Sequence, residues 1–214
     1  MPAGLGWPEP VMHRKRTAIL ISGRGSNMTA LINAAEDPDY PAEIVLVVSN
    51  RPHAGGLATA QAAGIATRIV DHVTYQDRVE FDAALDAALQ SDAIDLICLA
   101  GFLRMLTPAF VEKWRGRMIN VHPALLPQFK GLHTHARALA AGVKEHGATV
   151  HFVSAEIDSG PIILQAKVPV RDDDSEETLA ARVLTQEHRI YQEALRLVAE
   201  GRASIDNPDA SEPA

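Results

Sequence analysis

The chain has almost no cysteine, since Cys98 is the only one among its 214 residues. This excludes an intrachain disulfide, and a single thiol fits the reducing cytoplasm, where we expect the protein to work. Cys98 lies in an apolar stretch, 94–100, that has the character of a buried strand. A cysteine in that setting packs as a small apolar side chain, so we do not expect it to act as a nucleophile.

Long apolar runs and a strong basic charge are also missing. No apolar stretch reaches the roughly 20 residues that a membrane-spanning helix needs, and residues 1–16 lack the basic and apolar regions of a signal peptide. The net charge is −7, and the only basic run is His13–Arg16. We therefore expect no membrane and no nucleic acid as partner. The net charge does not exclude small substrates, including anionic ones, because local groups decide whether these bind.

Strand-like and helix-like segments alternate through the first half of the chain. Apolar β-type runs occur at 17–22, 44–49, 67–70 and 94–100, and helical patterns occur between them at 28–36, 55–63 and 75–91. In the last of these helices, the residues expected to face inward are Val79, Leu85, Ala88 and Leu89. The alternation predicts an α/β fold with a doubly wound, Rossmann-like and mostly parallel sheet.

The second half of the chain changes character. Residues 147–154 and 162–170 are β-type runs joined by a short turn, which makes them antiparallel neighbours. A long helix over 175–201 follows, with Ser175 at its start and Gly201 as its stop. We therefore expect antiparallel strands to continue the parallel sheet, and a long C-terminal helix to complete the fold.

These elements are expected to form one domain over residues 16–203. Residues 1–15 are rich in proline and glycine and are expected to be a disordered tail, while the polar residues 204–214 are expected to be a flexible one. Ligands of doubly wound sheets bind at the carboxyl ends of the strands. The segments that follow strands are therefore where a functional site is expected.

The turn after the first strand, Gly23-Arg24-Gly25-Ser26-Asn27, is rich in glycine. Glycine lets backbone N–H groups gather around an anion, and the N-terminus of the next helix adds partial positive charge, so phosphate is the expected ligand. The turn lacks the third glycine of a dinucleotide fingerprint and the Gly-Lys-Ser/Thr of a Walker loop. A plain tight turn, with Ser26 or Asn27 as helix cap, is the alternative.

Asn120 and His122 lie at the end of an apolar, strand-like run. Side chains two residues apart share one face of a strand, whereas Val121 points the other way into the core. Pro123 has no N–H for a ladder, so the strand should stop before it. An amide donor beside an imidazole can stabilise an oxyanion and move a proton.

Asp158 is the acid that can complete this group. It lies in the turn between the two antiparallel strands and reaches His122 if that turn packs beside the strand exit. A nearby carboxylate favours the charged imidazole, so we expect His122 to be protonated where this attraction outweighs burial. The alternatives are a structural histidine and an ordinary turn aspartate.

Three further polar positions stand out. His133 and His135 form a His-x-His pair without cysteine or a neighbouring carboxylate, so we expect no metal. His151 lies on an apolar strand and is expected to be a hydrogen-bonded core residue. Glu187 lies inside the apolar stripe of the last helix, where a carboxylate is costly unless it is paired. It therefore either bonds a nearby backbone group or arginine, or recognises a substrate.

The segment Asn120-Val121-His122-Pro123-Ala124-Leu125-Leu126-Pro127 resembles the signature of the folate-dependent formyltransferases, and the resemblance extends over about residues 16–203. It implies transfer of the formyl group of 10-formyltetrahydrofolate, as co-substrate, to the amine of glycinamide ribonucleotide in purine biosynthesis. By the same resemblance Asn120, His122 and Asp158 would be catalytic, and a mobile loop over 124–135 would border the site.

The resemblance also implies two sets of binding residues. The ribonucleotide would be bound by Gly25, Ser26, Asn27 and Glu187, with Glu187 at the ribose hydroxyls. The folate would be bound by Arg78, Leu103, Arg104, Met105 and Leu106, together with Asn120 and Asp158. For Arg78, a solvated helix position is the alternative.

Other functions stay open. A formyltetrahydrofolate hydrolase would use the same catalytic residues with water as acceptor, and a methionyl-tRNA formyltransferase would add RNA binding. These enzymes usually carry an extra N-terminal or C-terminal domain, respectively, and we expect neither here. A non-catalytic nucleotide-binding regulatory module would use the 23–27 turn alone and leave Asn120, His122 and Asp158 unexplained. A homodimer is compatible with the sequence.

Overall fold

The computed structural model describes residues 13–208 of the chain. Residues 1–12 of the expected disordered tail and 209–214 of the expected flexible tail lie outside this described part. Residues 204–208 form a turn, in which Ser204 and Asn207 exchange backbone hydrogen bonds of 2.9 and 3.1 Å. Ile205 of the same turn packs against the larger core cluster.

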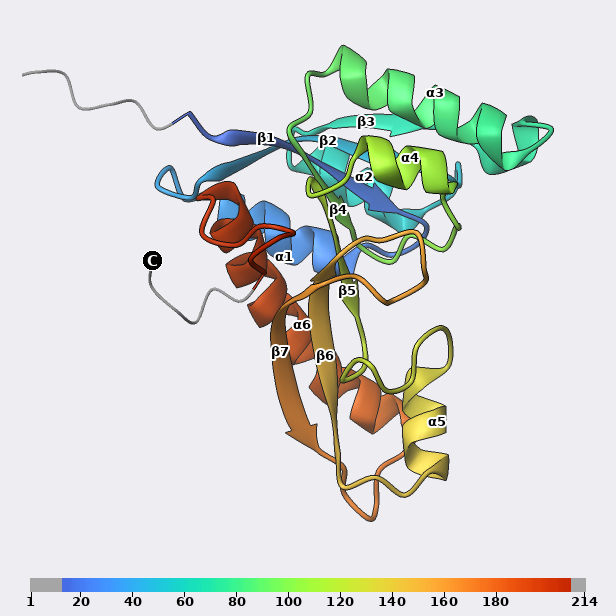
Figure 1. Ribbon diagram of the computed structural model, residues 1–214, viewed down its shortest axis with the longest axis vertical. Coiled ribbons are helices and arrows are strands. Elements are labelled where there is room, and N and C mark those ends of the chain that lie inside the picture. Colours follow the sequence, from blue (N-terminus) through green and yellow to red (C-terminus); the bar gives the residue numbers. More distant parts are fainter. Residues whose placement is uncertain (1–12, 209–214) are drawn as a thin grey trace, which may run out of the picture.

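A seven-stranded sheet forms the centre of the molecule, with the order β3-β2-β1-β4-β5-β6-β7 (Figure 1). Strands β1 to β5 pair in parallel, and β6 and β7 continue the sheet in antiparallel fashion. The strands are β1 (Lys15–Ile21), β2 (Ala42–Ser49), β3 (Ala66–Ile69), β4 (Leu96–Leu99), β5 (Met118–His122), β6 (Glu145–Phe152) and β7 (Ile162–Pro169). The predicted doubly wound α/β sheet is therefore confirmed.

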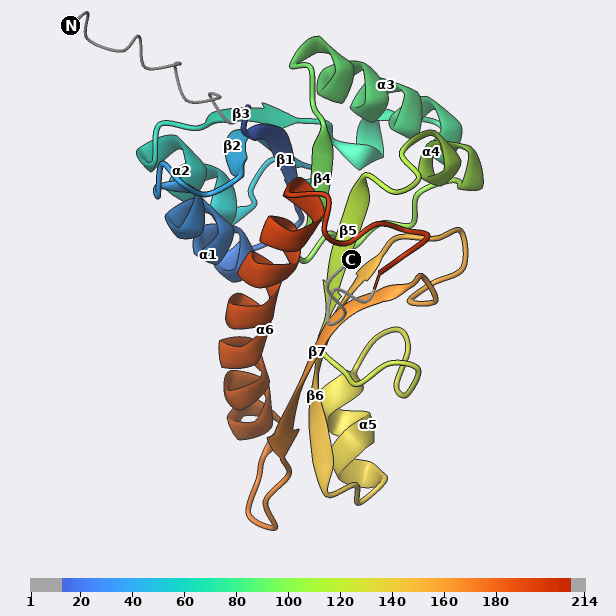
Figure 2. The same cartoon turned by 60° about the vertical axis from the view of Figure 1, so that its left-hand side comes forward.

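Helices cover both faces of this sheet (Figure 2). They are α1 (Ser26–Ala35), α2 (Gly55–Ala62), α3 (Arg78–Ser91), α4 (Pro108–Lys113), α5 (Thr134–Ala140) and α6 (Glu176–Ala199), with a 3₁₀ turn at His72–Thr74. One core cluster includes residues of α1, α2 and α6, and the second includes residues of α3 and α4. No helix in the described part of the chain is long and apolar enough to cross a membrane.

One expected core position in α3 was wrong. Val79 is 66% exposed, whereas Leu85, Ala88 and Leu89 are buried as predicted. The buried stripe of α3 begins at Phe81. Val79 lies two residues earlier, which is a rotation of about 200° around the helix, so its side chain faces solvent.

Strands β1, β4 and β5 end at one edge of the sheet. Leu20 pairs with Leu99, and Leu99 pairs with Asn120 in the next strand. The turn 23–27 and the segment 101–106 leave the sheet at this edge. It is the carboxyl edge at which doubly wound sheets bind their ligands.

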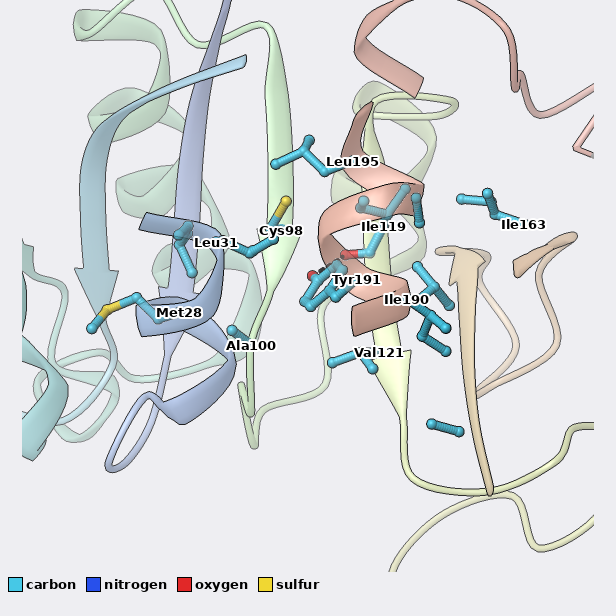
Figure 3. Packing of buried hydrophobic residues seen from close by; sticks show 14 of the residues in the cluster. Met28, Leu31, Cys98, Ala100, Ile119, Val121, Ile163, Ile190, Tyr191 and Leu195 are labelled. Atoms are coloured by element: carbon cyan, nitrogen blue, oxygen red, sulfur yellow. Dashed lines mark hydrogen bonds between the residues drawn. The ribbon is translucent and has the colours of Figure 1, made fainter. Parts of the chain in front are cut away.

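Tyr191 fastens the long helix α6 to the middle of the sheet. Figure 3 shows its ring among buried apolar side chains, with Ile119 of β5 and Ile190 of α6 close by. The Tyr191 hydroxyl lies 3.0 Å from the carbonyl oxygen of Leu99 and 3.2 Å from that of Ile119. Cys98 is fully buried in the same core, where burial raises the pKa of its thiol to about 12, which fits the predicted packing role.

Tyr191→Phe should lower the free energy of unfolding by about 1–2 kcal/mol, because it removes a buried hydroxyl that bonds the carbonyl oxygens of two strands. Urea denaturation followed by circular dichroism measures this loss. Tyr75→Phe, at a half-buried position, is the matched control and should change stability by less than about 0.5 kcal/mol. Equal losses in the two variants would contradict the anchoring role.

Candidate active site

The turn between β1 and α1 leaves the N-terminus of the helix without a side-chain cap. Gly25 is the N-cap residue, with φ 76°, and no side chain bonds the first turn, so neither Ser26 nor Asn27 acts as the cap. A Cβ on Gly25 would lie 3.1 Å from Met28 Cε and 3.3 Å from Gly56 Cα, and a positive φ disfavours other residues as well. The turn therefore presents backbone donors in the way that an anion site requires.

Glu187 of α6 reaches this turn. Its Oε2 accepts a hydrogen bond of 2.7 Å from Asn27 Nδ2, and Glu187 is only 7% exposed. Burial raises the pKa of the Glu187 carboxyl, and the bond from Asn27 opposes that rise. The partner is thus a side-chain amide of the glycine-rich turn, not a backbone group or an arginine. Asn27 Oδ1 is buried and has no hydrogen-bond partner within residues 13–208.

Asn120, His122 and Asp158 come together where β5 ends. The strand stops at His122, as the following proline requires. His122 Nδ1 lies 3.4 Å from Asp158 Oδ2, with side-chain exposures of 7% and 11%. This distance confirms that the 154–161 turn packs beside the strand exit. Asn120 joins the group through His151, whose Nε2 lies 3.2 Å from Asn120 Nδ2 and 3.7 Å from Asp158 Oδ1.

His151 has a larger part in this group than the sequence indicated. It is a buried, hydrogen-bonded residue, as predicted, because its Nδ1 donates to the Phe152 carbonyl at 2.8 Å. The antiparallel pairing of β5 with β6 also places it directly opposite Asn120. With the ring proton on Nδ1, Nε2 accepts from the Asn120 amide and fixes how that amide is turned. Only the strand register reveals this contact.

Burial is the larger effect on His122. It lowers the pKa of the imidazole, and outweighs the bond of 3.0 Å from Nε2 to the Phe129 carbonyl and the attraction of Asp158. Burial therefore opposes the charged imidazole, which the attraction of Asp158 was expected to favour. Burial alone would raise the pKa of Asp158, but the neighbouring His151 and the bond from the Gly131 N–H lower it. His122 therefore faces Asp158 Oδ2 with its Nδ1, while its Nε2–H is bonded to the Phe129 carbonyl.

The segment 101–106 after β4 exposes apolar side chains beside this edge. It has neither helix nor strand, and Leu103 and Met105 are 62% and 54% exposed. The intervening Arg104 turns inward, with its guanidinium 4.5 Å from the centroid of the Phe81 ring. The alternation leaves two exposed apolar side chains, which suit contact with a flat ring system.

Arg78 is separate from the catalytic group. It is exposed at the first position of α3, and no hydrogen bond or ion pair joins it to Asn120, His122 or Asp158. Its part in folate binding stays a prediction.

The segment 124–135 borders the group, and α5 begins at its end. The Gly131 N–H donates to Asp158 Oδ2 at 2.8 Å. The His135 ring packs edge-to-face on His146, with centroids 5.3 Å apart. Within residues 13–208, no three or more His, Cys, Asp or Glu side chains are grouped so that they could hold a metal ion.

The fold and the site define a doubly wound α/β protein with a polar site at the carboxyl edge of its sheet. The sequence matches the formyl transferase family model over residues 15–195, and the chain belongs to this family. The resemblance that the segment 120–127 carries is thereby confirmed.

Two curated relatives differ in how much of their length this chain spans. Phosphoribosylglycinamide formyltransferase of Escherichia coli is 47% identical over 187 residues, which cover 87% of this chain and 88% of that one. The human trifunctional purine biosynthetic protein adenosine-3 is 49% identical over 192 residues, 90% of this chain, but the chain spans only 19% of that protein's length.

Solved structures agree with this assignment. The phosphoribosylglycinamide formyltransferase of Brucella melitensis is 53% identical, with a TM-score of 0.84 over 87% of this chain and 96% of that one. A formyltetrahydrofolate deformylase from Burkholderia mallei is 28% identical, with a TM-score of 0.83 over 93% of this chain and 70% of that one.

Gly160→Ala should slow formyl transfer by roughly 100-fold, because a displacement of about 1 Å at a reacting site has that effect. A Cβ on Gly160 would lie 1.7 Å from the Phe152 carbonyl oxygen, so the turn that carries Asp158 must move away from β6. Steady-state rates test this. Gly55→Ala is the control, since its Cβ would meet nothing within 4 Å. Normal turnover in the Gly160 variant would mean that the turn tolerates displacement.

His146 should make the protein sensitive to acid. Burial lowers its pKa from 6.5 to about 4, and the nearby His135 and His122 add to this. The unfolded chain therefore takes up this proton at a higher pH than the folded protein does. The contribution of His146 to stability is complete above pH 6.5 and is lost as the pH falls toward 4. The loss should be on the order of 2–3 kcal/mol.

Urea denaturation at several pH values measures this loss. The variant His146→Leu should show a shallower decline between pH 6.5 and 4 than the wild type, whereas His53→Gln, at an exposed position, should follow the wild type. An unchanged slope in His146→Leu would assign the acid sensitivity to other groups.

Proposed function

We propose that this protein transfers the formyl group of 10-formyltetrahydrofolate to the amine of glycinamide ribonucleotide, a step of purine biosynthesis. The proposal rests mainly on one observation. Asn120, His122 and Asp158 come together at the edge of the sheet where the uncapped turn 23–27 also begins. The names of relatives that match over most of both chains support it. We expect the reaction to take place in the cytoplasm, with small molecules as its partners.

The ribonucleotide fits the turn and the residue that bonds it. The N–H groups of residues 25–27 and the Ser26 hydroxyl would donate to the phosphate at the start of α1. Glu187, already bonded to Asn27 at 2.7 Å, has a second carboxylate oxygen with which to accept from ribose hydroxyls. A phosphorylated ribose therefore supplies both the anion and the donors that these residues need.

The folate fits the segment 101–106. Exposed Leu103 and Met105 offer an apolar surface to the pterin ring, and the main chain of the segment offers hydrogen-bond groups to the edge of that ring. Arg78 at the start of α3 would pair with the carboxylates of the folate tail. Asp158 and Asn120 would lie beside the nitrogen that carries the formyl group.

The reaction is direct attack of the amine on the formyl carbon. A new C–N bond forms while the carbonyl oxygen becomes an oxyanion, to which Asn120 and the Nε2–H of His122 donate. Ionised Asp158 orders a water that takes a proton from the amine and delivers it to the folate nitrogen as the old C–N bond breaks. No covalent enzyme intermediate forms.

Much of the acceleration would come from aligning the two substrates, and one oxyanion donor contributes roughly 3–4 kcal/mol. Because the Nε2–H of His122 is bonded to the Phe129 carbonyl, we expect the 124–135 segment to shift when both substrates bind.

A formyltetrahydrofolate hydrolase is the second candidate, since the deformylase relative shares the fold. It would use the same catalytic group with water in place of the amine. The buried Glu187–Asn27 pair favours the ribonucleotide reading, because water needs no such pair. A regulatory module that binds only a nucleotide leaves Asn120, His122 and Asp158 without a role.

Tetrahydrofolate release, followed by absorbance with and without glycinamide ribonucleotide, distinguishes these candidates. The proposal predicts that turnover depends on the ribonucleotide. Equal turnover with water alone would favour the hydrolase, and no folate turnover under either condition would favour the regulatory module.

Asn120→Ala should reduce turnover by roughly 10²–10³-fold, as the loss of an oxyanion donor does. Binding of both substrates should survive, because the contact is made in the transition state. Rates and calorimetric affinities check the two parts separately. Asn33→Ala, at an exposed position in α1, is the control. Near-normal turnover in Asn120→Ala would return this residue to a structural role.

A further inference from the structure

The segment 101–106 is held to the sheet by two bonds from one residue. The Ser22 N–H donates to the Gly101 carbonyl at 3.1 Å, and Ser22 Oγ accepts from the Leu103 N–H at 2.8 Å. Phe102 and Leu106 pack against the second core cluster and Arg104 lies over Phe81, whereas the Leu103 and Met105 side chains are exposed. The two bonds from Ser22 add fixed main-chain positions on both sides of residue 102.

The Ser22 hydroxyl is oriented by Asn50 at the end of β2. It donates to Asn50 Oδ1 at 2.6 Å, which turns a lone pair toward the Leu103 N–H. Ser22 and Asn50 are 3% and 2% exposed, and the Asn50 carbonyl accepts from His72 Nδ1 at 2.7 Å. A buried chain of this kind is cooperative, and removing one member leaves its neighbours unsatisfied.

We propose that Ser22, oriented by Asn50, is a positioning residue that fixes the segment 101–106 for folate binding. The inference rests on the proposed function, which assigns this segment to the folate. Ser22 acts through the Leu103 main chain and does not itself touch the reacting atoms.

The ribonucleotide side should not depend on the same hydroxyl. Although Ser22 directly precedes the 23–27 turn, that turn has its own support, because the Gly56 N–H donates to the Gly23 carbonyl at 3.0 Å. Loss of the hydroxyl should therefore weaken the folate selectively. A general loss of structure would weaken both substrates.

Ser22→Ala should weaken tetrahydrofolate binding roughly 5–20-fold, measured by calorimetry, and should raise the KM for 10-formyltetrahydrofolate by a similar factor. The kcat and the KM for glycinamide ribonucleotide should stay within about twofold. Ser22→Thr keeps the hydroxyl and should recover most of the affinity. Asn50→Ala should reproduce the effect, and the double variant should lose little more than either single one.

Ser49→Ala is the matched control. Ser49 is another fully buried serine near the same edge, but its hydroxyl bonds the backbone of Arg51, at 2.8 and 3.0 Å. Its loss should leave folate affinity within about twofold, whatever it does to stability. Hydrogen exchange of the Leu103 amide should quicken in Ser22→Ala and not in Ser49→Ala.

Unchanged tetrahydrofolate affinity in Ser22→Ala, or an equal loss in Ser49→Ala, overturns the inference and leaves the proposed function intact. A wild-type protein that binds no tetrahydrofolate overturns the proposed function as well. Folate binding that depends on Ser22, without formylation of the ribonucleotide, would overturn only the proposed acceptor.

Discussion

The site depends on the parallel pairing of β1, β4 and β5. Because Leu20, Leu99 and Asn120 are paired in register, strands β1, β4 and β5 end at the same edge of the sheet. The glycine-rich turn, the segment 101–106 and the exit of β5 then lie next to one another. Tyr191 of α6 reinforces this arrangement, since its hydroxyl reaches carbonyl groups of both β4 and β5.

Buried polar groups at this edge are stabilised by specific partners. Burial raises the pKa of Glu187, and the Asn27 amide limits that rise; burial lowers the pKa of His122, even with Asp158 beside it. An unpaired group of this kind would cost several kcal/mol. The partners therefore reduce the free-energy cost of burying these groups. They also fix the orientation in which the side chains meet a substrate.

Much of the fold could be predicted from the sequence, because alternating apolar periodicity defines long elements well. The helices α4 and α5 were missed, since six or seven residues are too few to display a period. The orientation of Val79 was also misjudged, although the helical period contained the answer. Among site residues, Asn120, His122 and Asp158 came from local pattern and from family resemblance. The contacts of His151 and Ser22 could not be predicted, because they depend on strand order and register.

A crystal structure with glycinamide ribonucleotide and a stable folate analogue bound together tests the central claim most directly. The account predicts the phosphate at the N–H groups of residues 25–27 and the pterin against Leu103 and Met105. The amine and the formyl-bearing nitrogen should meet within hydrogen-bond reach of Asn120 and Asp158. A phosphate bound away from that turn, or reacting atoms separated from Asn120 by the segment 124–135, would contradict it.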